Sequence, residues 1–203
     1  MRSANGGWSF ACDPDASPIT APAIWRPELY SATLPLDAAP SDYEDVPPLN
    51  LTGAAPILVD RAATDGRHLI IADPDGDHRL WLRTAPGAPT AVLLPLDEDF
   101  ELRLSAAGRL FRRLRGTGSG PPPARLAVTA FQRSRLALLL SVFDRLGGGA
   151  SKREIASDLI YPGLDPGSAA EWKASAERRR TQRLCDEARA MVAAGYRRLL
   201  GGR

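Results

Sequence analysis

The period of hydrophobic and polar positions changes along this chain, and the change divides the chain into three parts. Residues 1–55 show no regular period and are rich in proline, so we interpret them as an extended, irregular leader. Residues 56–115 hold short apolar or β-branched runs and then one stretch with helical spacing. Residues 124–203 have helical spacing almost throughout. The pattern predicts an α+β protein.

Four short apolar runs predict strands in the second part. Turn-forming sequences such as TDG and PDGD separate these runs. Because neighbouring strands joined by tight turns pair with each other, the order favours a small antiparallel β-meander of three or four strands. The runs are 56–60, 67–73, 78–84 and 90–96.

One helix should follow the meander. Acidic residues at 97–99 precede it, and arginines gather towards its other end, an order that stabilises a helix dipole without any ligand. The segment GTGSGPPP at 116–123 then breaks the chain and marks the best domain boundary. The apolar positions with helical spacing are Phe100, Leu104, Ala107, Phe111 and Leu114. The arginines are Arg109, Arg112, Arg113 and Arg115.

Three capping boxes predict the helices of residues 124–203. A Ser or Thr is followed three positions later by Glu or Gln in Thr129–Gln132, Ser151–Glu154 and Ser168–Glu171. We expect a helix after each box, the third being long and rich in arginine. The result is a trihelical, helix-turn-helix-like domain. The connection at 161–167 is longer than the usual turn of about three or four residues, which is a departure from the strict motif.

Charge is divided unevenly between the two halves of the chain. Residues 1–100 contain 6 Arg and 15 acidic residues, a net charge of −9. Residues 101–203 contain 20 Lys and Arg and 9 acidic residues, a net charge of +11. This division favours contact between the C-terminal half and a polyanion. A solvated basic helix surface is the alternative interpretation.

The last helix carries the candidate DNA contacts. At about 100° per residue, its apolar side contains Leu184, Ala188 and Met191, and a row of polar side chains lies opposite. Arg can bind guanine, Gln can bind adenine, and Ser suits either a base or a phosphate. We predict base contacts by Ser175, Arg178, Arg179 and Gln182, with Arg189 extending the row. We predict phosphate contacts by Lys152, Arg153, Lys173 and Arg183.

Several spaced blocks of sequence carry a family resemblance. In the last part they are SKREIASDLIYP, EWKASAERRRTQRL and MVAAGYRRLL. Within 67–113 they are RHL, RLWLR, AVLLPLDEDFELRL and FRR, and upstream they are FACDPDASP and IWRPE. These blocks, over residues 8–200, resemble the RovC-type DNA-binding domain family of bacterial type VI secretion regulators. The resemblance implies transcriptional regulation through double-stranded DNA, bound by the last helices of a homo-oligomer.

Other function classes have less support from the residues. His68 and His78 are the only histidines, and no phosphate loop, nucleophile elbow or metal-ligand cluster is present, so we predict no enzyme activity, no cofactor and no metal. The acidic run at 73–77 lacks the last glutamate of a calcium loop, because residue 84 is Thr. The alternative function is a protein-interaction module. Its basic last helix would dock on an acidic partner such as an RNA polymerase subunit, or on the acidic N-terminal half.

The two cysteines and the apolar runs bear on the compartment. Cys12 and Cys185 lie in unlike contexts and support neither a disulfide framework nor a metal site. No apolar run approaches the ~20 residues of a membrane span, and the first residues do not read as a secretory signal. We therefore expect a cytoplasmic protein without a membrane partner.

Overall fold

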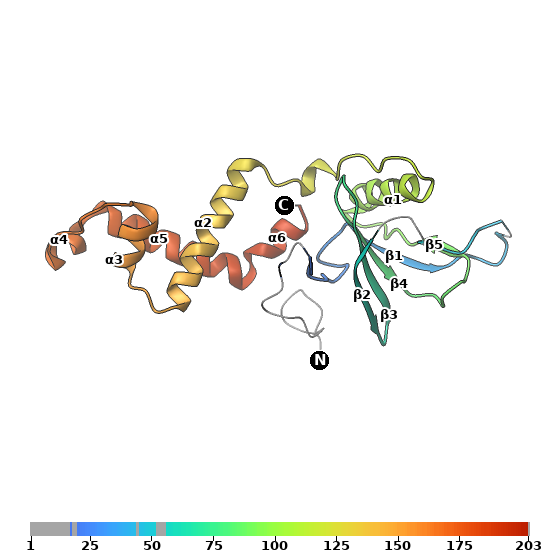
Figure 1. Ribbon diagram of the computed structural model, residues 1–203, viewed down its shortest axis with the longest axis horizontal. Coiled ribbons are helices and arrows are strands. Elements are labelled where there is room, and N and C mark those ends of the chain that lie inside the picture. The colour runs from blue at the N-terminus through green and yellow to red at the C-terminus, as the bar shows by residue number, and fades with distance from the viewer. Residues whose placement is uncertain (1–16, 18–19, 44, 52–55, 203) are drawn as a thin grey trace. The chain divides into compact units, whose positions relative to one another are not determined.

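The computed structural model of the protein contains two compact units, which we describe separately (Figure 1). The first unit contains residues 1–127 and 200–203, and the second contains residues 128–199. The structure describes residues 17, 20–43, 45–51 and 56–202. Cys12 and most of the predicted leader before residue 20 lie outside the described residues. The predicted α+β class is confirmed, because strands precede a series of helices.

A five-stranded mixed sheet dominates the first unit. Three strands form consecutive antiparallel pairs, as predicted, but the next strand along the chain does not extend them. A further strand, β1, lies between: it is parallel to β4 and antiparallel to β5. The predicted antiparallel meander of three or four strands is therefore present as β2, β3 and β4, and the fourth run, which contains β5, pairs elsewhere. The strands are β1 (Thr33–Ala38), β2 (Ile57–Ala63), β3 (Gly66–Ile71), β4 (His78–Leu82) and β5 (Thr90–Val92), in the spatial order β2-β3-β4-β1-β5.

Strand β1 lies within the stretch that the sequence pattern assigned to an irregular leader. The proline content of this stretch was one reason for that assignment, and Pro35 lies in the middle of β1, where it donates no hydrogen bond to the sheet. The Pro35 carbonyl accepts a hydrogen bond from the Leu93 N–H at 2.9 Å, one residue beyond the end of β5. Pro35, which has no backbone N–H to donate, therefore lies at the end of the pairing between β1 and β5, where the lost hydrogen bond does not interrupt the ladder. Leu34 and Leu36 on either side of the proline are both buried.

Helix α1 (Phe100–Leu114) covers the sheet with a different side from the one its spacing suggested. Leu104 and Phe111 of the predicted stripe are exposed. The short side chain of Ala106 and the neighbouring Leu110 pack on the sheet instead, and two buried arginines flank them. Both the predicted row and the buried row of Leu102, Ala106 and Leu110 have helical spacing, so the spacing alone does not show which row faces the sheet. The core contains Leu34, Leu36, Leu69, Ile71, Leu80, Ala106 and Leu110.

The tight turn between β2 and β3 requires glycine. Gly66 has a φ of +134°, a conformation that residues with a side chain rarely adopt. A Cβ atom at this position would lie 2.2 Å from the carbonyl oxygen of Leu82 on β4. The TDG sequence is thus both a turn signal and a point of close backbone approach.

Three helical segments pack around the core of the second unit. They are α2 (Ala130–Gly147), α3 (Lys152–Ile155) with the π-helical turn η2 (Ala156–Ile160), and α5 (Ala176–Ala190). Their shared core contains Leu139, Val142, Ile155, Leu184, Cys185 and Ala188. The short helix η1 (Ala124–Leu126) lies in the first unit, and the other short helices are α4 (Ala169–Ala174), η3 (Met191–Gly195) and α6 (Tyr196–Leu200).

All three predicted capping boxes are present, but the third begins a short helix. Thr129, Ser151 and Ser168 each accept a backbone hydrogen bond, and the partner Glu or Gln returns one. The single long last helix was wrong, because α4 ends at Ala174 and Ser175 starts α5. The connection from η2 to α5 is therefore longer than a helix-turn-helix turn.

Residues 124–147 bear on the predicted absence of a membrane partner. By length and composition alone they could span a membrane, and they are the one such stretch among the described residues. Core helices of soluble proteins meet the same criterion, and Leu139 and Val142 of α2 are buried in the core of the second unit. The absence of membrane association stays a prediction.

Two adjacent leucines on α2 test the core assignment. We expect Leu139→Ala to lower the free energy of unfolding of the second unit by about 2–5 kcal/mol, because the side chain is 2% exposed. Leu140 is 56% exposed, so Leu140→Ala should cost less than about 0.5 kcal/mol. Urea denaturation of both variants makes the comparison. Equal losses would contradict the assignment.

Candidate nucleic-acid interface

Helix α5 turns one side to the core of the second unit and the other to solvent. Thr181, Leu184 and Cys185 are buried, and the Thr181 hydroxyl donates to the Glu177 carbonyl at 2.8 Å. Burial raises the pKa of the Cys185 thiol, which keeps it protonated. The buried side fixes the rotation of α5, so its polar side must face away from the core.

The first half of α5 carries uncompensated positive charge. Arg178, Arg179 and Arg183 are exposed. None of the three forms an ion pair with any residue that the structure describes. Like charges this close repel one another, so the cluster is favourable for binding an anion.

The second half of α5 is neutralised by its own acidic residues. Asp186 lies 3.6 Å from Arg189, measured from carboxylate oxygen to guanidinium nitrogen, and Glu187 pairs with Arg135 of α2 at 2.5 Å. The Gln182 side-chain amide donates to both carboxylate oxygens of Asp186 at 2.8 Å. Positive charge therefore concentrates near the start of the helix.

Arg178 and Arg179 extend towards the end of α4. One nitrogen of Arg179 donates to the Ala174 carbonyl at 3.0 Å, and one of Arg178 lies 3.5 Å from the Lys173 carbonyl. A guanidinium has several N–H donors, so a single such bond leaves most of each group available. These contacts hold both side chains beside the junction of the two helices.

The structure gives Ser175 a capping role. Its hydroxyl accepts a hydrogen bond from the Arg178 N–H at 3.0 Å and donates to the Trp172 carbonyl at 2.9 Å. The residue has extended backbone and precedes α5, so it is not on the helical face where the sequence pattern put it. The hydroxyl proton of Ser175 is already donated to the Trp172 carbonyl, so the side chain has no second proton to donate to a base.

The predicted phosphate contacts lie on three elements of the second unit. Lys152 and Arg153 open α3 and are half-buried, and Arg153 donates to the Gly167 carbonyl. Lys173 in the last turn of α4 is exposed. The structure adds Arg180, which lies 5.9 Å from the centre of the Tyr161 ring. The sequence analysis did not predict a contact by Arg180, although Arg180 belongs to the visible run of three arginines at 178–180.

A family comparison identifies this part of the chain. Residues 93–201 match the RovC DNA-binding domain model, described as the DNA-binding domain of a type VI secretion transcription factor. The match covers more than half of the chain. This protein belongs to the RovC DNA-binding domain family. The predicted resemblance is confirmed, and with it DNA binding and transcriptional regulation as the general role.

The RovC match does not extend over the sheet. Residues 32–92, which contain all five strands, match a separate domain of unknown function (DUF7012). No curated protein and no solved structure matches the chain. The RovC region starts before α1, so it includes α1 and η1 of the first unit and the helices of the second.

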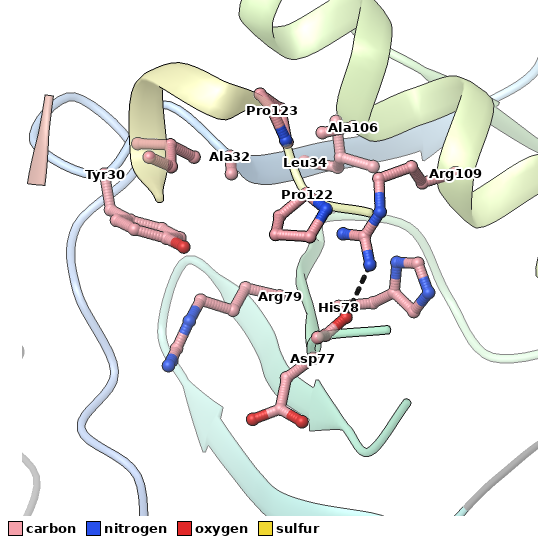
Figure 2. Close-up of a pocket in the computed structure, with 12 residues that line it drawn as sticks. Tyr30, Ala32, Leu34, Asp77, His78, Arg79, Ala106, Arg109, Pro122 and Pro123 are labelled. Carbon is pink, nitrogen blue, oxygen red and sulfur yellow. Dashed lines mark hydrogen bonds between the residues drawn. The ribbon is translucent and has the colours of Figure 1, made fainter. Parts of the chain in front are cut away.

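The arginines of α1 bind their own chain. Arg109 donates to the Gly120 carbonyl and to the carbonyls of Asp75 and Gly76, at 2.8–2.9 Å. Figure 2 shows its guanidinium extending from α1 to the turn beside His78. Arg112 donates twice to the Ser119 carbonyl. For Arg109 and Arg112, the prediction that they need no ligand thus has a physical basis beyond the helix dipole.

A buried polar cluster lies beneath these arginines. The Ser119 hydroxyl donates to Asp73 at 2.8 Å, and Nε2 of His78 lies 3.1 Å from the same hydroxyl. Because the hydroxyl proton goes to Asp73, Nε2 must donate to Ser119. This order differs from that of a hydrolytic triad, in which serine gives its proton to histidine. The cluster ties segment 116–123 to the turn after β3.

Burial and neighbouring charges set the protonation of this cluster. Burial lowers the pKa of His78, Arg109 lowers it further, and Asp73 opposes both. Burial raises the pKa of Asp73, but hydrogen bonds from Ser119 and the Asp75 N–H outweigh it, so the pKa lies below its ordinary value. The folded protein therefore holds a neutral imidazole beside a carboxylate.

Removing the cap at Ser175 should affect stability rather than base preference. We expect Ser175→Ala to lower the free energy of unfolding of the second unit by about 1 kcal/mol, because the first turn of α5 loses its cap. Ser175→Thr keeps the hydroxyl and should restore most of the loss. Thermal unfolding measures both variants. A changed DNA sequence preference in a stably folded Ser175→Ala variant would instead support a base contact.

Acidification should weaken the first unit at His78. The folded protein holds a lowered histidine pKa, so the unfolded chain binds a proton first and stability falls as pH drops below about 6.5. His68 is also buried with a lowered pKa and contributes its own share. Hydrogen exchange of the β3 and β4 amides, corrected for intrinsic rates, should show this loss. His78→Gln should reduce it, and an unchanged pH dependence would argue against the role of His78.

Proposed function

We propose that this protein is a sequence-specific, double-stranded-DNA-binding transcriptional regulator whose α5 enters the major groove. The uncompensated cluster of Arg178, Arg179 and Arg183 carries the proposal. It lies on the solvent side of a helix whose other side is fixed in the core. Helices of this kind contact base edges mainly through their first turns. The positive half of α5 is its first half, which agrees with that geometry.

The contacts divide into base recognition and positioning on the backbone. Arg178 and Arg179 are our candidates for guanine, since a guanidinium can bind O6 and N7 together. Gln182 would have to leave Asp186 before it could bind adenine, and Arg189 would have to leave the same carboxylate. Phosphates fit the more peripheral Lys152, Arg153, Lys173 and Arg183. We assign Ser175 to the helix cap.

The same proposal extends to the setting of the protein. A regulator of bacterial genes acts in the cytoplasm, where the DNA is. We also propose a homo-oligomer, because symmetric half-sites allow two copies of a short recognition helix to bind together. An acidic protein surface, such as one on RNA polymerase, is the competing partner for the arginine cluster.

A selection from genomic DNA fragments tests the proposal. We expect the wild-type protein to enrich one recurring motif. Alanine substitutions of Arg178 and Arg179 should remove it, with about 1–3 kcal/mol lost for each bidentate guanine contact. Arg61→Ala is the matched control, because Arg61 is an exposed arginine on β2. This variant should enrich the same motif as the wild type.

Salt dependence separates the two classes of contact. Lys173→Ala should weaken binding evenly across sequences and reduce the slope of log affinity against log salt by about 1, because one phosphate contact is lost. Equal enrichment by the wild type and the Arg178/Arg179 variant would contradict base recognition. Binding to acidic proteins without any DNA enrichment would favour the interaction module.

A further inference from the structure

The first unit contains an apolar cavity that the DNA-binding role does not use. Its volume is about 510 Å³, and its lining comes from α1, β1, β5 and the segment 46–50. Leu36 and Leu110 of the core form part of this lining. Cavities of roughly 300–1,000 Å³ are the usual size for sites that bind small organic molecules. The cavity is large enough for such a ligand.

The outer side of α1 supplies the exposed apolar surface of this cavity. Phe111 is 63% exposed and Leu114 is 39% exposed, although both line the cavity. Moving a phenyl ring from water into an apolar environment is favourable, so the exposed ring of Phe111 would gain from an apolar partner. These residues belong to the stripe whose spacing predicted a buried face. The sheet leaves Phe111 and Leu114 of this stripe exposed, so an apolar occupant of the cavity would bury them.

The opposite wall is a short proline segment held to the sheet. Pro47 and Pro48 line the cavity, and Pro48 forms an isolated β-bridge with Pro89 next to β5. Proline fixes its own φ angle, which limits the conformations that this wall can adopt. The two prolines therefore reduce the conformational freedom that this wall can lose on binding, which lowers the entropic cost of binding.

One charged side chain lines the cavity, and it is positive. Arg115 lies at the C-terminal end of α1, and its side chain has no ion pair or hydrogen bond with the described part of the chain. The other arginines near this end of α1, Arg112 and Arg113, are engaged by Ser119 and Asp73. No acidic residue is in the lining. An apolar cavity with one available guanidinium is complementary to a carboxylate with an apolar body.

We propose that this cavity binds a small organic carboxylate with an extended apolar chain or ring. The apolar body would cover Phe111 and Leu114, and the carboxylate would pair with Arg115. The site lies within the first unit and is independent of the arginine cluster on α5. Its success or failure therefore does not depend on the proposed DNA contacts.

Decanoate and decanol are matched probes for this site, because they share a chain length and differ in charge. We expect saturable binding of decanoate to the full-length protein by isothermal titration calorimetry, about tenfold tighter than decanol. Arg115→Gln should remove that difference while leaving decanol binding unchanged. Phe111→Asp adds a negative charge at an exposed position, so it should abolish decanoate binding without unfolding the protein.

Two control substitutions lie outside the cavity. Leu104→Asp changes an exposed residue of the same helix, and Arg61→Gln removes an exposed cation on β2. Both should leave decanoate binding as in the wild type. The absence of saturable decanoate binding, or equal affinity for the two probes, would overturn the proposal. A smaller species for Phe111→Asp in sedimentation velocity would also overturn it, because a second copy of the chain would then cover the cavity.

Discussion

The first unit depends on the pairing of α1 arginines with backbone carbonyl groups. Arg109 binds three carbonyls, from the turn after β3 and from segment 116–123, while it is 5% exposed. A buried guanidinium without such partners would be strongly destabilising, and so would the unpaired carbonyls. In this structure the guanidinium supplies the donors that the three carbonyls need, and the carbonyls supply the acceptors that the guanidinium needs. One helix thereby fixes a hairpin turn and the segment that leads to the second unit.

This pairing changes the meaning of the positive charge in the C-terminal half. A net charge of +11 over residues 101–203 suggested a polyanion partner, yet Arg103, Arg109 and Arg113 of α1 bind carboxylates or carbonyls of the first unit. Near the start of α5, Arg178 and Arg179 each reach one backbone carbonyl of α4, but neither they nor Arg183 forms an ion pair with a described carboxylate. Proximity to carboxylates, rather than residue count, therefore decides which arginines keep their charge available to an external anion.

Local sequence signals predicted local structure well, and packing decided the rest. The capping boxes and the hairpins around Gly66 and the turn at 73–77 depend on residues close in sequence, and the structure contains them. Strand β1 depends on pairing with β4 and β5, which lie far along the chain, and its proline made a strand difficult to predict. The break before α5 depends on one hydroxyl at Ser175, which helical spacing does not distinguish from a helical serine. Among the predicted contacts, the pairing of Gln182 with Asp186 follows from a four-residue spacing that was visible in the sequence.

Helix α1 lies in the region that matches the RovC family, although it packs in the first unit and not in the second. By family match it opens the RovC DNA-binding region, but by packing it completes the sheet of the first unit. Its inner side holds the core, its arginines hold segment 116–123, and its outer side lines the apolar cavity. Segment 116–123, which α1 holds through Arg109 and Arg112, precedes α2 in the chain. The proposed ligand contacts at Phe111 and Arg115 thus lie on the same helix whose arginines hold segment 116–123.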